Sequence, residues 1–228
     1  MQYQDRIRLI ICCFVPFLTT GEADGDGLFQ VQLAVSQDGI HFERYRRPYL
    51  KAGLIRDRRG VEGELDCGLV NMGVGMVRRG DELYQYYVGC RRTHIDPRAA
   101  QARGIRGESV FRAVQRLDGF VSADAGPEGG EIITPPILFT GSRLVLNADC
   151  SGLGEIWVEL QDREGHPLPG RSVDDAVSVD RNGTAQEVWW KSGPDVAAAA
   201  GKPVRLRIRM RSAKLYAFQF LRSFSSSE

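Results

Sequence analysis

Apolar and polar residues alternate along much of the chain with the period of two that indicates β-strands. In PVRLRIRMR, residues 203–211, every second residue after the proline is apolar and the others are arginines. In GEIWVELQD, residues 154–162, three aliphatic residues share one face, which leaves Trp157 on the other, polar face. We expect both strands to be half-buried, with the arginine row on a solvated face that keeps the sheet soluble.

Runs of strand length that are bounded by turn residues recur along the whole chain. They cover residues 6–14, 28–35, 41–45, 68–78, 82–89, 108–117, 129–134, 142–148, 154–161, 185–190, 203–210 and 213–221. Helix-like runs occur only at 97–104 and 195–202, and each is too short to stand alone. The pattern therefore predicts an all-β chain.

The first twenty residues allow two interpretations. Basic residues followed by an apolar run have the layout of a secretory signal peptide. The apolar segment LIICCFVPFL, residues 9–18, equally suits a strand that is covered on both faces. It is too short to span a bilayer, and no small-residue cleavage pattern precedes the acidic segment 21–27. We favour the strand.

Composition and charge exclude several classes of partner. The chain has 30 basic and 29 acidic residues and a net charge of +1, which gives no reason to expect nucleic acid or a membrane as a partner. No phosphate-binding loop is present, so no cofactor is expected. The balance suits a soluble protein, and we favour a cytoplasmic over a secreted location.

The five cysteines are odd in number and scattered, without a C-x-x-C pair or a histidine cluster. We therefore expect no metal site. We interpret the cysteines as reduced, mostly buried thiols, with a Cys67–Cys90 bridge as the alternative.

The spacing of the strands changes near residues 117–119. Before this point, long, charged and glycine-rich connections separate the strands, and after it the turns are tighter. We predict two domains, 1–118 and 119–228. The second, of about 110 residues, fits a two-sheet sandwich.

Two groups of segments carry a resemblance to a known family. LFQVQLAVSQDGIHFERYRRPYL (28–50) and ELDCGLVNMGVGMVRRGDELYQYYVGCRRTH (64–94) resemble the end of one propeller blade and the start of the next in invertase and fructosidase-like glycoside hydrolases of the family 32/43 type. Residues 118–170 and 201–220 resemble the β-sandwich that follows the propeller in those proteins. The resemblance implies incomplete β-propeller blades followed by a jelly-roll-like β-sandwich, with carbohydrate as the partner.

The first domain departs from that family in its length. A five-bladed propeller needs about 250 residues or more, and 118 residues make about two blades. Either the chain is the C-terminal part of a longer product, or its N-terminal part packs in a different, compact way. Open sheet edges in an unclosed propeller would allow self-association. The Ser36–Gly39 segment is interpreted as a tight turn with no catalytic role.

Glycoside hydrolysis needs two carboxyl groups on opposite sides of the scissile bond. The resemblance places Glu62, Glu64 and Asp66 at the start of an inner strand, and we take Asp66 as the first catalytic candidate and Glu64 as the second. The alternative is that these acids lie in a solvated loop or bind the amides of the next strand. The usual catalytic pair of the family would belong to blades outside this chain, so we expect no robust hydrolase activity from the chain alone.

Three further residues are candidates for substrate binding. His94 and Arg92 follow a strand end and could bind a hydroxyl or carboxylate, although an exposed loop histidine is the alternative. Trp157 could stack on a sugar ring or cover an interface between domains.

Three functional hypotheses follow. The chain is a glycoside hydrolase-like protein that acts on or binds carbohydrate and is inactive alone, or a non-catalytic β-sandwich module that binds carbohydrate or braces a domain, or a degenerate reading frame. A carboxylate pair across a pocket would favour the first, and an exposed tryptophan platform the second.

Overall fold

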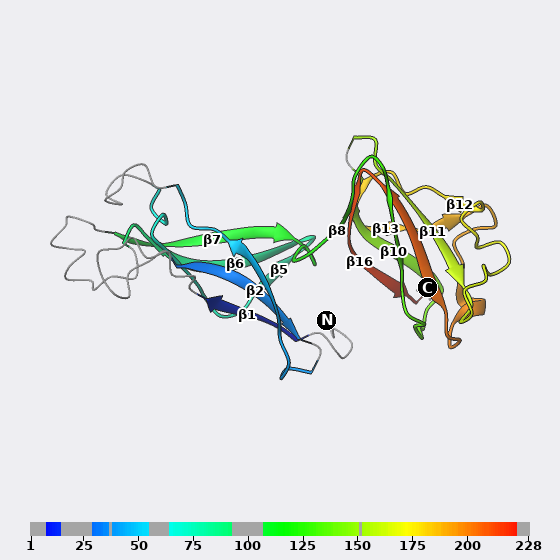
Figure 1. Cartoon of the computed structure of the whole chain (residues 1–228), viewed down its shortest axis with the longest axis horizontal. Helices are drawn as coiled ribbons and strands as arrows, with labels where there is room; N and C mark the ends of the chain where they lie inside the picture. Colours follow the sequence, from blue (N-terminus) through cyan, green and yellow to red (C-terminus); the bar gives the residue numbers. More distant parts are fainter. Residues whose placement is uncertain are drawn as a thin grey trace, which may run out of the picture. The chain divides into compact units, whose positions relative to one another are not determined.

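The computed structural model describes residues 8–14, 29–36, 38–54, 64–92, 107–150 and 152–222, with the backbone alone for 8–14. The chain divides into two compact units, Met1–Gln115 and Arg116–Glu228 (Figure 1). Within the described ranges every regular element is a strand except one 3-10 turn, Ala197–Ala199. The all-β prediction is confirmed, and the described strands form several sheets without a closed barrel.

The first sheet of unit 1 is antiparallel, in the order β1 (Arg8–Phe14), β2 (Gln30–Ser36) and β3 (Glu43–Leu50). Residues 8–14 are thus a strand, as the sequence predicted. Between β2 and β3, Oδ1 of Asp38 accepts hydrogen bonds from the backbone N–H groups of Ile40 and His41, at 2.8 and 2.7 Å. Gly39 has a φ of 77°, which glycine adopts without strain. The predicted tight turn is confirmed.

The second sheet of unit 1 is built around β6 (Glu82–Cys90). Both β4 (Leu69–Met72) and β5 (Val77–Arg79) pair with β6, and β7 (Glu108–Arg116) pairs with it as well. The sequence predicted one strand over 68–78, but residues 73–76 separate two short strands.

One face of this sheet is covered and the other is exposed and apolar. On the covered face, Tyr49 of β3 lies between Gln85 of β6 and Gln115 of β7, to which it is hydrogen-bonded. On the other face, the Arg112 guanidinium lies 4.6 Å from the centre of the Tyr84 ring. The same face exposes Val77, Tyr86, Val88, Val110 and Val114.

Unit 2 contains two sheets that share one core (Figure 1). The first has the order β13 (Asn182–Glu187), β10 (Arg143–Asp149), β16 (Ala213–Leu221) and β8 (Ala123–Ala125). The second has the order β11 (Glu155–Gln161), β15 (Arg205–Arg211) and β9 (Gly130–Ile133). A short pair, β12 (Ala176–Val177) with β14 (Trp189–Trp190), completes the unit.

The core of unit 2 follows the predicted alternation. The inward-facing apolar residues of the two strands are all buried: Val204, just before β15, with Leu206, Ile208 and Met210 of β15, and Ile156, Val158 and Leu160 of β11. The outward face of β11 was expected to be solvated, but Glu159 and Gln161 at one end of it are buried as well. Glu159 accepts hydrogen bonds from Gln161 Nε2 at 2.7 Å and from the Val173 backbone N–H at 2.8 Å. The polar face of β11 is therefore buried at this end, at Glu159 and Gln161.

Cys67, Cys90 and Cys150 are buried thiols that form no disulfide, so the alternative Cys67–Cys90 bridge is absent. Burial is the main cause of the raised pKa of the Cys150 thiol, which is about 11. Burial also raises the pKa of the Cys90 thiol. The described part of the chain contains no helix that could cross a membrane.

Candidate functional site

The two predicted catalytic acids lie together in a turn before β4. Oδ1 of Asp66 and Oε2 of Glu64 each lie 2.4 Å from the position that a Cβ on Gly53 would take, so the two oxygens are within twice that distance of each other. Oε2 of Glu64 accepts a hydrogen bond from the Leu54 backbone N–H at 3.0 Å. The absence of a side chain on Gly53 is what allows both carboxylates to approach the same backbone.

Asp66 also contacts β6. Its Oδ2 accepts a hydrogen bond from the Tyr87 hydroxyl at 2.8 Å, and the Tyr87 ring stacks on Phe111 of β7 with centroids 5.1 Å apart. A Cβ on Gly89 would lie 2.3 Å from Asp66 Cβ, so this glycine is required for the contact. Burial and the neighbouring Asp66 and Glu64 carboxylates raise the pKa of Tyr87 to about 12. The hydroxyl therefore remains a donor to Asp66 at neutral pH.

The acids are held by hydrogen bonds within unit 1. Asp66 accepts from a strand side chain and Glu64 from the amide of a preceding loop residue, rather than from the amides of the next strand. A glycosidase places its two carboxyl groups on opposite sides of the scissile bond. Here both carboxylates approach one glycine from the same turn, so this geometry alone does not make a catalytic pair.

Of the predicted binding residues in unit 1, Arg92 is engaged in an ion pair. Its Nη2 lies 2.8 Å from Oε1 of Glu108, and its Nε donates to the same oxygen at 3.1 Å. This pair connects the end of β6 to the start of β7. His94 lies outside the described residues.

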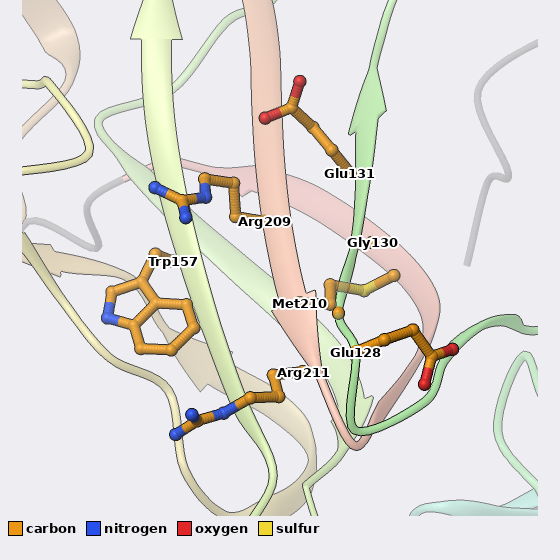
Figure 2. Close-up of a pocket in the computed structure, with 8 residues that line it drawn as sticks. Glu128, Gly130, Glu131, Trp157, Arg209, Met210 and Arg211 are labelled. Atoms are coloured by element: carbon orange, nitrogen blue, oxygen red, sulfur yellow. The ribbon is translucent and has the colours of Figure 1, made fainter.

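Trp157 belongs to unit 2 and lies on an open surface there. The surface is a shallow cavity of about 550 Å³, lined by Glu128, Gly129, Gly130, Glu131, Trp157, Arg209, Met210 and Arg211. We call these residues the Trp157 surface. Figure 2 shows the half-buried indole between the guanidinium groups of Arg209 and Arg211, with the Glu128 carboxylate turned away.

Strand pairing explains this arrangement. Trp157 of β11 is directly opposite Arg209 of β15, and Arg209 is directly opposite Glu131 of β9. Directly paired residues share a face, so the three side chains form one row across the sheet. Diagonal to Trp157, Arg211 lies 2.5 Å from Glu155 in an ion pair.

The sequence identified Trp157 but missed Arg209, Arg211 and Glu131 as its neighbours. The arginine row was interpreted as a solvated face, and nothing local to it indicates which arginine meets the tryptophan. The available signal was the shared alternation of residues 154–162 and 203–211. It becomes informative only once the register of β11 and β15 is known.

Comparison with known proteins adds little to this geometry. No protein-family model and no curated protein matches the chain. A solved structure of a glycoside hydrolase family 43 arabinoxylan arabinofuranohydrolase from Bacillus subtilis, in complex with cellotetraose, is similar over 98% of this chain and 53% of that one. The identity is 13% and the TM-score 0.27, and the chain spans about half the length of that enzyme. A TM-score this low does not establish a shared fold, and we draw no functional conclusion from it.

Proposed function

We propose that the chain binds carbohydrate through the Trp157 surface and does not cleave it by itself. The observation that carries this proposal is an indole on an open sheet face, flanked by two arginines. Small-molecule sites combine an aromatic or apolar wall with a few polar groups that fix orientation. The ring of Trp157 offers a flat apolar wall for the C–H face of a sugar, and the guanidinium groups offer hydrogen-bond donors to its oxygens.

The pairing of the strands that carry these residues favours binding. Strand β15 is paired on both sides, with β11 and with β9. The inward residues on either side of Arg209, Ile208 and Met210, are buried in the core. Side chains on such strands are held in place before a ligand arrives, so less conformational entropy is lost on binding.

The narrower proposal, a glycoside hydrolase-like protein with a partial propeller in residues 1–118, rests on unit 1. Its support is the exposed apolar face of the β6 sheet, where Val77, Val88 and Val110 are 57%, 37% and 73% exposed. Neighbouring propeller blades cover such faces. In this proposal Asp66 and Glu64 remain the candidate acids, and open sheet edges could support self-association.

The experiment that tests carbohydrate binding uses the purified whole chain in affinity electrophoresis against a panel of soluble polysaccharides. We expect retardation by at least one polysaccharide. Replacement of a central aromatic anchor costs about 2 kcal/mol or more, so Trp157→Ala should weaken that binding about thirtyfold or more.

Trp189→Ala is the matched control. Trp189 is 46% exposed in the same unit, and its indole N–H donates to Glu187 at 2.9 Å, outside the Trp157 surface. This variant should bind like the wild type. If the chain binds no polysaccharide, or if Trp157→Ala lowers stability and leaves binding unchanged, the proposal is wrong and a bracing role for Trp157 replaces it.

A further inference from the structure

We infer that the sugar taken by the Trp157 surface is acidic: a uronic acid whose ring stacks on Trp157 and whose carboxylate is bound by Arg209. This inference rests on the proposed function and names its substrate class. Its basis is that the acids beside Trp157 are already paired, whereas the guanidinium of Arg209 has no partner among the described residues.

The acceptors near Trp157 are already engaged. Glu131 lies 2.7 Å from the Nε of Arg207, and Glu155 lies 2.5 Å from an Nη of Arg211. Glu159 is buried and accepts from a side-chain amide and a backbone N–H. Each of these three carboxylates therefore already has a cationic or N–H partner, and the carboxylate of Glu128, which also lines the surface, is turned away from the indole (Figure 2).

The donors next to the indole are free. Of the four arginines on the outward face of β15, Arg207 and Arg211 pair with acids, and Arg205 donates from Nε to the Arg163 carbonyl at 3.0 Å. Within the part of the chain that the structure describes, Arg209 is the arginine of this row without a hydrogen-bond or ion-pair partner. The Trp157 indole N–H likewise donates to no described residue.

The geometry of a uronic acid matches this set of groups. A neutral sugar presents only hydroxyl groups, which cannot neutralise the charge of the Arg209 guanidinium. A uronic acid carries an acceptor-only carboxylate at the edge of its pyranose ring. A ring stacked on Trp157 would place that carboxylate over Arg209, which lies directly across the strand pair, and guanidinium binds carboxylate through two parallel hydrogen bonds.

The test compares acidic polysaccharides with neutral counterparts of the same backbone. Polygalacturonate and alginate are each measured beside their fully methyl-esterified forms, by affinity electrophoresis and by titration calorimetry with oligosaccharides. We expect at least one acidic form to bind about tenfold or more tightly than its ester. Arg209→Gln should remove most of that preference.

Arg205→Gln is the matched control for general charge. Arg205 lies on the same face of the same strand, four positions before Arg209, and donates to a backbone carbonyl away from the indole. It should leave the acid-to-ester preference unchanged. An equal effect of Arg205→Gln and Arg209→Gln would mean unspecific attraction and would overturn the inference.

Failure of this inference can be told apart from failure of the proposed function. If esters and acids bind equally, and Arg209→Gln has no effect while Trp157→Ala abolishes binding, carbohydrate binding stands and the acidic specificity is wrong. If the wild type binds no polysaccharide of any kind, both are wrong.

Discussion

The hydrogen bond between Tyr87 and Asp66 offers a direct test of whether Asp66 is a structural residue. Tyr87→Phe removes the hydroxyl that donates to Asp66 Oδ2 at 2.8 Å and keeps the ring that stacks on Phe111. The substitution therefore changes one hydrogen bond without opening a cavity. If Asp66 serves mainly to fix the turn before β4, unit 1 should become less stable.

The expected loss can be worked out in two ways. A hydrogen bond to a charged group contributes about 1.5–3 kcal/mol when buried, and less for a partly exposed pair such as this one. The pKa of Tyr87 is raised from 10.0 to about 12. Burial is the largest cause of that shift, and the part that is due to Asp66, discounted for solvent screening, corresponds to about 1 kcal/mol. We therefore expect Tyr87→Phe to lower the free energy of unfolding of unit 1 by about 1 kcal/mol.

The pH dependence supplies a sharper signature. The folded state holds the Tyr87 proton to a higher pH than the unfolded state does, so the stabilisation is fully present below pH 10.0. It is lost as the pH rises through about 12. The difference in free energy of unfolding between the wild type and Tyr87→Phe should be constant around neutral pH. It should become smaller above pH 10.0.

The assay is NMR of the chain with ¹³Cζ-labelled tyrosine, combined with urea unfolding. The Tyr87 resonance is assigned by its loss in Tyr87→Phe and should titrate near pH 12. In Asp66→Asn its pKa should fall but stay above the ordinary value, because burial is the largest cause of the shift. Titration of Tyr87 at pH 10.0 in the wild type, with unchanged stability of Tyr87→Phe, would refute this reasoning and leave Asp66 available for a ligand.

Two further predictions concern the units separately. Leu206 is fully buried in unit 2, so Leu206→Ala should lower the free energy of unfolding by about 2–5 kcal/mol. Tryptophan fluorescence during urea unfolding measures this loss. Leu138 is exposed, so Leu138→Ala should change the stability little. In unit 1, Asp38→Ala should weaken amide hydrogen-exchange protection across β2 and β3, because the turn loses two backbone hydrogen bonds. Hydrogen bonds from His41 and from backbone amides lower the pKa of Asp38, so in the wild type the turn should loosen only as the pH falls below 3.8, and Asp38→Ala should lack that transition.

Strand positions could be predicted from the sequence because alternation is a local signal. The predicted runs 203–210 and 213–221 correspond to β15 and β16 within two residues at each end. The short strands β8 and β12 were missed because each has at most three residues and no alternation of its own. Strand β8 exists because Ala123–Ala125 pairs with β16. The predicted run 185–190 also begins too late, because Asn182 already starts β13, where it pairs with Asp149 of β10.

The sites were harder to predict because they depend on register between distant segments. Alternation placed Trp157 on the outward face correctly. It could not show that Arg209 lies opposite, since nothing within either segment specifies how two strands separated by more than forty residues align. The same holds for Asp66, whose partner Tyr87 is selected by the pairing of β4 with β6.

The core and the Trp157 surface of unit 2 are specified by the same alternation, which constrains how substitutions act on them. Along β15, Ile208 and Met210 are buried while Arg209 between them is exposed. A slip of one residue in the register would bury the arginine and expose both apolar neighbours, so the packed core holds the surface residues in position. A cavity such as that of Leu206→Ala weakens the core without changing the register. Leu206→Ala should therefore lose stability and, where it remains folded, retain its affinity for a polysaccharide, whereas Trp157→Ala should lose affinity and retain most of its stability.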